Sequence, residues 1–215
     1  QKQEAVILSQ LVFTGNLPGS ESHPETGDSE WPVVWLQCDA CAGRGPYSVQ
    51  ALALSGRVPR PVRSGGRNIG FVYEDAFARY CRLWGLLPAD RTGSRSAQAR
   101  SVFETAAALL AQAGFHMTDI VRTWLFLDRL PEWYEDFNAV RTGFFTEAGI
   151  FGHRIPASTG IGARNPFGAA VTMNVFAVRP KSPELTIQAV ASPFQNPALD
   201  YGSYFSRAVE IGSPS

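Results

Sequence analysis

Cysteine is scarce in this chain, with only Cys38, Cys41 and Cys81 among 215 residues. An odd and low count argues against a disulfide framework and is typical of a protein from a reducing cytoplasm. Cys38 and Cys41 have the spacing of a redox or zinc pair, but no second pair follows and the three histidines are scattered. Because a zinc site needs four suitably placed ligands, we expect no metal and no cofactor.

Excess charge and long apolar runs are also missing. The chain has 19 basic and 19 acidic residues, so its net charge of zero gives no general attraction to nucleic acid or membrane. No apolar run approaches the roughly 18 residues of a membrane span, and the opening Gln-Lys-Gln-Glu-Ala lacks the apolar core of a signal peptide. We therefore expect a cytoplasmic protein with neither a nucleic-acid nor a membrane partner.

No familiar catalytic motif is present either. Ser158 has no evident His and Asp partners for a nucleophilic triad, and no glycine-rich phosphate loop with a lysine occurs. The hydrophobic content of 45% nevertheless suffices for a folded core, in one large domain or two small ones.

The first third of the chain predicts strands separated by loops. Strand-like runs are residues 5–14, 32–37, 48–54, 68–74 and 78–86, and residues 16–30 are expected to be a surface loop. Residues 56–67 contain four arginines, two prolines and three glycines without an acid, which excludes a helix and predicts an exposed loop. That loop is either simply solvated or an arginine-rich lid over an anionic substrate.

Two helices and a central strand are expected next. Ser94–Ala113 has apolar residues at three- and four-residue spacing and ends before Gly114, and Ile120–Leu127 is a strongly apolar strand. Pro131 is expected to start the second helix, with a packed stripe of Trp133, Phe137, Val140 and Phe144. Tyr134, Asn138 and Arg141 would share a neighbouring face of this helix.

Residues 155–179 contain the most informative pattern. Ile155–Ala163 and Ala169–Arg179 are expected to form a pair of strands, with small residues that let the backbone approach a ligand. Ser158, Thr159 and Arg164 bring two hydroxyls and a cation to this segment, which suits a carboxylate. The alternative is a plain glycine-rich turn.

Several of these segments together resemble the Rid (YjgF/YER057c/UK114) superfamily, whose members are also called endoribonuclease L-PSP-like. The matching pieces are the helix end around Gly114, then Met117–Leu127, Phe137–Phe145 and Ile155–Gly160. Within the superfamily, Pro156–Ala163 is most similar to the chorismatases, which are longer chains of two Rid-like domains. The resemblance implies an α+β, chorismate-mutase-like sheet with two helices packed on one face, here with an N-terminal strand extension, and it implies a homotrimer or an assembly with a second Rid-like unit.

The resemblance also predicts how the chain is divided. Residues 1–67 would supply strands and loops of the same domain, and residues 68–192 would be the Rid-like domain. Residues 193–215 would be a linker and the first strand of a possible second Rid-like unit, because Asn196–Glu210 resembles the opening of such a domain. The alternative is a plain C-terminal strand on the first sheet; Leu185–Ala191 and Tyr201–Ile211 are the expected strands.

The candidate substrate-binding residues combine cations, hydroxyls and aromatic rings: Arg122, Trp124, Tyr134, Asn138, Arg141, Ser158, Thr159 and Arg164. Arginine suits a carboxylate because its planar fork donates two parallel hydrogen bonds. The alternative roles are an ion pair for Arg122, a pair with Glu135 or Asp136 for Arg141, and core packing for the two aromatic residues. No catalytic residue is predicted.

Departures from the family pattern leave three functions open. The position of the carboxylate-binding arginine of Rid deaminases holds Ser158, and the acidic positions of the next strand hold Thr172 and Asn174. The leading hypothesis is a chorismatase-like hydrolase or lyase acting on a small carboxylated metabolite, although the family's catalytic Glu lies in a second domain. The alternatives are an enamine/imine deaminase and a non-catalytic scaffold or metabolite-binding domain. RNA cleavage gains little support from zero net charge and the lack of a catalytic His pair.

Overall fold

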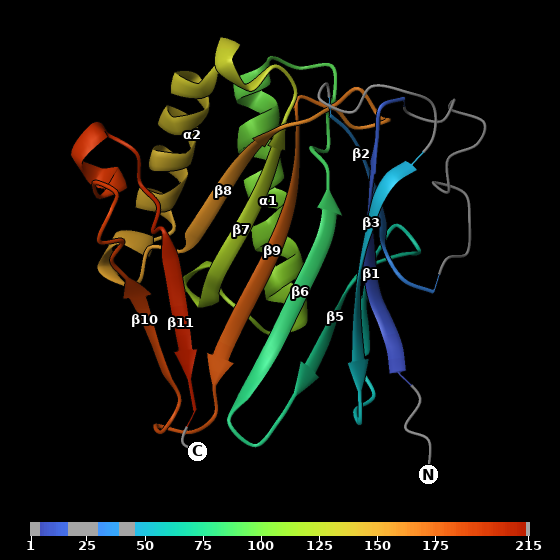
Figure 1. Ribbon diagram of the computed structural model, residues 1–215, viewed down its shortest axis with the longest axis vertical. Helices are drawn as coiled ribbons and strands as arrows, with labels where there is room; N and C mark the ends of the chain where they lie inside the picture. The colour runs from blue at the N-terminus through green and yellow to red at the C-terminus, as the bar shows by residue number, and fades with distance from the viewer. Residues whose placement is uncertain (1–4, 17–29, 39–45, 214–215) are drawn as a thin grey trace.

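A six-stranded mixed sheet forms the centre of the molecule (Figure 1). The computed structural model describes residues 5–16, 30–38 and 46–213. The strand order is β4-β5-β6-β9-β7-β8, and only the β7–β8 pair at one edge is parallel. The strands are β4 (Arg60–Ser64), β5 (Arg67–Glu74), β6 (Ala78–Leu86), β7 (Ile120–Leu127), β8 (Ala157–Gly162) and β9 (Val171–Pro180).

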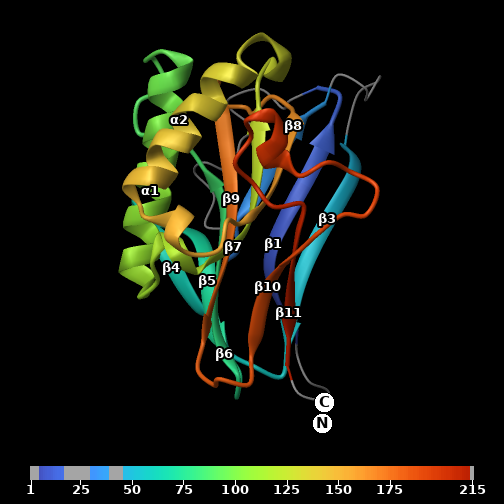
Figure 2. The same cartoon turned by 90° about the vertical axis from the view of Figure 1, so that its left-hand side faces the viewer.

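Two helices, α1 (Arg95–Ala113) and α2 (Tyr134–Glu147), cover one face of this central sheet (Figure 2). The apolar stripe of α1, including Val102, Phe103 and Leu110, is buried against the sheet and against α2. The Ser94 side chain accepts a hydrogen bond from the Ala97 amide at the start of α1, and Gly114 ends the helix at φ 82°. The predicted α+β fold, with two helices on one face of the sheet, is confirmed.

A second sheet, here called the small sheet, packs on the opposite face. It has the order β2-β1-β3, with β1 (Ala5–Thr14), β2 (Val33–Gln37) and β3 (Pro46–Ser55). Leu8, Val34 and Leu36 from the small sheet form a core with Phe71 and Trp84 of the central sheet. The predicted N-terminal strand extension is therefore a separate layer over the central sheet.

A two-stranded ribbon made of β10 (Thr186–Val190) and β11 (Ala208–Gly212) lies on the same side as the small sheet (Figure 2). Ile187 and Val209 pack against Val121 and Val178 of the central sheet. Just before β11, Ser206 forms a parallel bridge with Ala157 at the edge strand β8. Short 3-10 helices connect the larger elements: η2 (Met117–Asp119), η3 (Leu130–Glu132), η4 (Ile150–Gly152) and η5 (Ala198–Tyr201).

Two predictions about loops and pairing are wrong. Residues 56–67 are not one loop, because Arg60–Ser64 is strand β4 and pairs with β5. The two strands expected in residues 155–179 do not pair with each other, since β7 lies between β8 and β9 and bonds to both. The sequence periodicity identified each strand but contained no information on the order of strands in the sheet.

The second helix and the C-terminal segment also differ in detail. Pro131 lies in η3, and α2 begins three residues later at Tyr134. The last strand joins β10 rather than extending the first sheet as a full strand; the division into domains stays a prediction. Cys41, His23 and most of the predicted loop at residues 16–30 lie outside the described residues.

Candidate functional site

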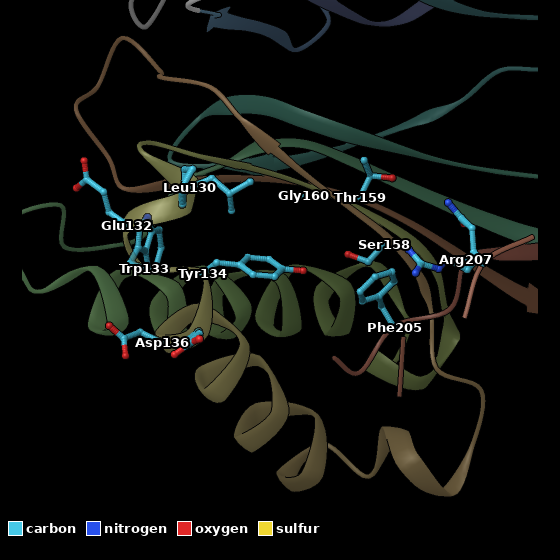
Figure 3. A pocket seen from close by; sticks show the side chains of 13 residues that line it. Leu130, Glu132, Trp133, Tyr134, Asp136, Ser158, Thr159, Gly160, Phe205 and Arg207 are labelled. Atoms are coloured by element: carbon cyan, nitrogen blue, oxygen red, sulfur yellow. The ribbon is translucent and has the colours of Figure 1, made fainter. Parts of the chain in front are cut away.

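A cleft of about 910 Å³ opens at the β8 edge of the central sheet. Three segments that are distant in sequence form its walls: residues 130–136, the β8 residues Ser158–Gly160, and a C-terminal group of Gln195, Phe205 and Arg207. Figure 3 shows the Tyr134 side chain reaching from the start of α2 toward Ser158, with Phe205 and Arg207 at the other end.

Packing at the start of α2 holds the first wall in place. Trp133 is buried and its ring contacts Phe137 edge to face, with 5.7 Å between centroids. The Trp133 indole N–H donates to the Asp128 carbonyl at 2.8 Å. With Trp133 fixed, the next residue, Tyr134, directs its ring into the cleft.

Small and hydroxyl-bearing residues of β8 form the second wall. A side chain at Gly160 would lie 4.0 Å from the Tyr134 ring, so glycine leaves room for a ligand beside that ring. The Thr123 hydroxyl donates to the Ser158 Oγ at 2.9 Å, and the Arg122 guanidinium donates to the Thr159 Oγ1. Both hydroxyls are thus oriented from β7 while they still line the cleft.

The third wall comes from the segment that precedes β11. Ser206 joins this segment to β8, because its amide donates to the Pro156 carbonyl at 3.0 Å and its carbonyl accepts from the Ser158 amide at 3.3 Å. The ring of Phe205, the residue before Ser206, contacts two guanidiniums, those of Arg141 and Arg207, each with its carbon 5.3 Å from the ring centroid. Sequence analysis missed Phe205 and Arg207 as site residues.

The charges of the cleft are unevenly distributed. Glu135 and Asp136 lie in the first turn of α2, where carboxylates interact favourably with the helix dipole. Glu132 is paired with Arg95 at 3.0 Å and with Arg129 at 3.8 Å. Among the described residues that line the cleft, Arg207 is the one with a positive charge, at the end away from α2.

The structure brings together only some of the predicted site residues. Tyr134, Ser158 and Thr159 line the cleft. Arg141 is 3% exposed, donates to the Asn138 Oδ1 at 2.7 Å and reaches the cleft only through its contact with Phe205.

The other predicted cations lie elsewhere. Arg164 follows the end of β8 and forms an ion pair with Asp128 at 3.3 Å, so it does not meet Arg141 in this cleft. Arg122 stacks on Trp124, a residue of the core beside the small sheet, on the face of the central sheet that the helices do not cover. The arginine-rich stretch 56–67 is not near the cleft, because β4 is at the opposite edge of the sheet from β8. Binding roles for these arginines stay predictions.

The positions that correspond to the acidic residues of Rid deaminases are buried in the sheet. The Asn174 Oδ1 accepts a hydrogen bond from the Gly85 amide at 2.8 Å, and Asn174 is 2% exposed. Thr172 is equally buried. Gly85 itself lies against the small sheet, since a Cβ there would lie 3.2 Å from the Val34 Cγ2.

Within the described ranges, no three His, Cys, Asp or Glu side chains are grouped as a metal site would require. None of the helices in those ranges has the length and apolar character needed to cross a bilayer.

One protein family matches the middle part of the chain. Residues 85–179 match the model of the family described as Endoribonuclease L-PSP. This segment carries the L-PSP family pattern. It includes both helices and most of strands β7 to β9, so the predicted Rid resemblance is confirmed for this segment. Among curated proteins, no sequence matches the chain.

Solved structures are similar to just over half of this chain. The YjgF gene product of E. coli is 26% identical and covers 55% of this chain and 92% of its own, with a TM-score of 0.45. E. coli TdcF, solved with bound serine, is 21% identical with the same coverages and TM-score. Yeast Mmf1 is 21% identical and covers 56% of this chain and 92% of its own, also with a TM-score of 0.45.

Proposed function

We propose that this protein is chorismatase-like and binds a small carboxylated metabolite in the cleft between α2, β8 and residues 195–207. The observation that carries the proposal is the position of Arg207 in a cleft that also contains the hydroxyls of Tyr134, Ser158 and Thr159. A guanidinium donates two parallel hydrogen bonds to a carboxylate, and hydroxyls can donate to or accept from the rest of a polar ligand.

The uneven charge of the cleft supports one orientation of the ligand. Glu135 and Asp136 repel a carboxylate at the α2 end, so the acid group of the ligand belongs at the Arg207 end. A hydroxyl or another hydrogen-bond donor of the ligand then faces the two carboxylates. A hydroxylated carboxylic acid with an unsaturated ring satisfies both ends, and its ring lies beside Tyr134 and Phe205.

Turnover in this proposal uses a catalytic acid from outside the described residues. Chorismatases, which Pro156–Ala163 resembles, have their catalytic Glu in a second Rid-like domain, and such a domain or another chain would supply it here. Imine deamination is less well supported, because the corresponding positions hold Ser158, Thr172 and Asn174.

A non-catalytic metabolite-binding domain is the second candidate. The observation that favours it is the structural role of Asn174. Its side-chain oxygen accepts a hydrogen bond from the Gly85 amide, and Asn174 does not line the cleft.

Calorimetric titration with chorismate tests the binding step. Arg207→Gln should weaken binding about 10-fold to 100-fold, as expected when a charge-assisted hydrogen bond worth about 1.5–3 kcal/mol is lost. The matched control is Arg60→Gln, which removes an exposed arginine from the far edge of the sheet. Equal affinity of the wild type and Arg207→Gln would contradict the proposal. Pyruvate release from chorismate would favour the chorismatase-like enzyme, accelerated breakdown of 2-aminoacrylate the deaminase, and binding without either reaction the metabolite-binding domain.

A further inference from the structure

A row of charged and aromatic side chains crosses the face of the central sheet opposite the helices. Arg82 on β6 is the register partner of Phe176 on β9, and Phe176 is the register partner of Arg122 on β7. The Arg82 guanidinium carbon lies 3.7 Å from the centroid of the Phe176 ring, and that of Arg122 lies 5.2 Å from a Trp124 ring centroid. All four side chains are partly exposed. Figure 1 shows β6 and β9 running between the small sheet and the ribbon.

Neither arginine of this row has an acidic partner within the described residues. The Arg82 Nε donates to the Tyr73 hydroxyl at 3.1 Å, and Arg122 donates to the Thr159 hydroxyl. The Arg122 Nε is buried and has no hydrogen-bond partner among the residues described. The Asp75 carboxylate, between β5 and β6, instead accepts from Tyr80 at 2.8 Å and pairs with Arg57 at 3.6 Å. Among the described residues, the two guanidiniums therefore contact neutral rings and hydroxyls but no carboxylate.

Two partly buried guanidiniums without a carboxylate raise the free energy of the folded protein unless an anion binds to them. A charge that is partly removed from water loses hydration, and only a counter-charge with good hydrogen bonds restores it. Burial lowers the pKa of Arg122, because the charged form loses hydration when it is removed from water. Aromatic rings stabilise guanidiniums by cation–π contact, but they leave the in-plane N–H donors available to a ligand.

We propose that Arg82 and Arg122 form a second anion site, which binds a small organic dicarboxylate across Phe176. The arginines are on alternate strands, which lie roughly 10 Å apart in a sheet, so two carboxylates joined by a short chain reach both guanidiniums. The apolar chain of such a ligand passes over β9 beside the Phe176 ring, whose face is covered by the Arg82 guanidinium. Arg82 and Phe176 do not line the Arg207 cleft, whereas Arg122 donates to the cleft residue Thr159, so Arg82 is the residue that tests this site separately.

Succinate and acetate are the probes, titrated calorimetrically in a low-salt buffer that contains no carboxylate. Succinate should bind more tightly than acetate, and Arg82→Gln and Arg122→Gln should each weaken succinate binding at least 10-fold. Arg82→Lys, which keeps the charge but not the two-donor fork, should give an intermediate loss and serves if the Gln variants do not fold. Arg60→Gln is the control for a general loss of positive charge, and Arg207→Gln tests whether the probe binds in the cleft instead.

Three outcomes would overturn the inference. Undiminished succinate binding by Arg82→Gln would remove this arginine from the site. Loss of succinate binding in Arg207→Gln alone would assign the probe to the cleft. A change of oligomeric state in Arg82→Gln, measured by light scattering, would mean that the row contacts another protein chain rather than a small anion. Arg207→Gln tests the cleft and Arg82→Gln tests this second site, so either proposal can fail while the other stands.

Discussion

Asn174 and Thr172 occupy the positions where Rid deaminases carry acidic residues, and the structure predicts opposite effects when each is replaced. In Asn174→Ala, the Gly85 amide loses its acceptor inside the sheet. An unpaired buried amide costs about 1–3 kcal/mol, and a cavity on the order of 40 Å³ adds about 1 kcal/mol at roughly 24 cal/mol per Å³. The free energy of unfolding should therefore fall by about 2–4 kcal/mol. At roughly 2–4 °C per kcal/mol for a chain of this size, the melting temperature should fall by about 4–16 °C.

Thr172→Val is the matched substitution at the other position. The Thr172 Oγ1 is buried and has no hydrogen-bond partner within the described part of the chain. Valine keeps the shape and removes an unsatisfied hydroxyl, so stability should be unchanged or higher by up to about 1 kcal/mol. Urea unfolding followed by circular dichroism measures both variants. If Asn174→Ala unfolds at the wild-type midpoint yet loses ligand turnover, the residue acts in chemistry and our structural interpretation is refuted.

Three further predictions concern the core, pH and thiol reactivity. Leu36→Ala should lower the free energy of unfolding by about 2–5 kcal/mol in urea, because Leu36 is fully buried between the two sheets; a loss under about 1 kcal/mol would mean that the small sheet packs loosely. Burial raises the pKa of Asp75, but hydrogen bonds from Ala78, Tyr80 and Phe77 outweigh this and lower it overall. The stabilisation from Asp75 is thus present above its ordinary pKa and lost as pH falls through the lowered value. Between about pH 5 and pH 2.5 the unfolding free energy of Asp75→Asn should fall less than that of the wild type, and parallel pH curves would contradict this. Burial raises the pKa of the Cys81 thiol to about 12, so iodoacetamide should modify Cys81 only after unfolding, as followed by mass spectrometry. Rapid labelling of the folded protein at Cys81 would be inconsistent with its burial.

Local sequence signals predicted the elements well. Helix α1 begins after Ser94 and ends at Gly114 as expected, because capping and glycine conformation depend on neighbouring residues only. Strand β7 has the predicted bounds, Ile120–Leu127, since it is apolar along its whole length and covered on both faces. The L-PSP family pattern was likewise contained in short contiguous motifs.

Features that depend on contacts between distant residues could not be predicted from local sequence patterns. The order β9-β7-β8 and the use of Arg207 as a wall of the cleft both arise from pairing between distant segments. The face of the sheet on which Arg122 lies follows from the strand register, which periodicity alone does not fix. Tyr134, Ser158 and Thr159, which line the cleft, were predicted from local patterns, a helical face for Tyr134 and a small-residue strand for the other two.

The bridge at Ser206 attaches the third wall of the cleft to β8 through backbone hydrogen bonds. Two main-chain hydrogen bonds hold Ser206 to the rim of β8, and its hydroxyl adds a third by donating to the Ile155 carbonyl at 2.7 Å. Since Phe205 and Arg207 flank this residue, the same three bonds position both side chains in the wall of the cleft. The deuterium uptake of the Ser206 amide measures how often this attachment opens.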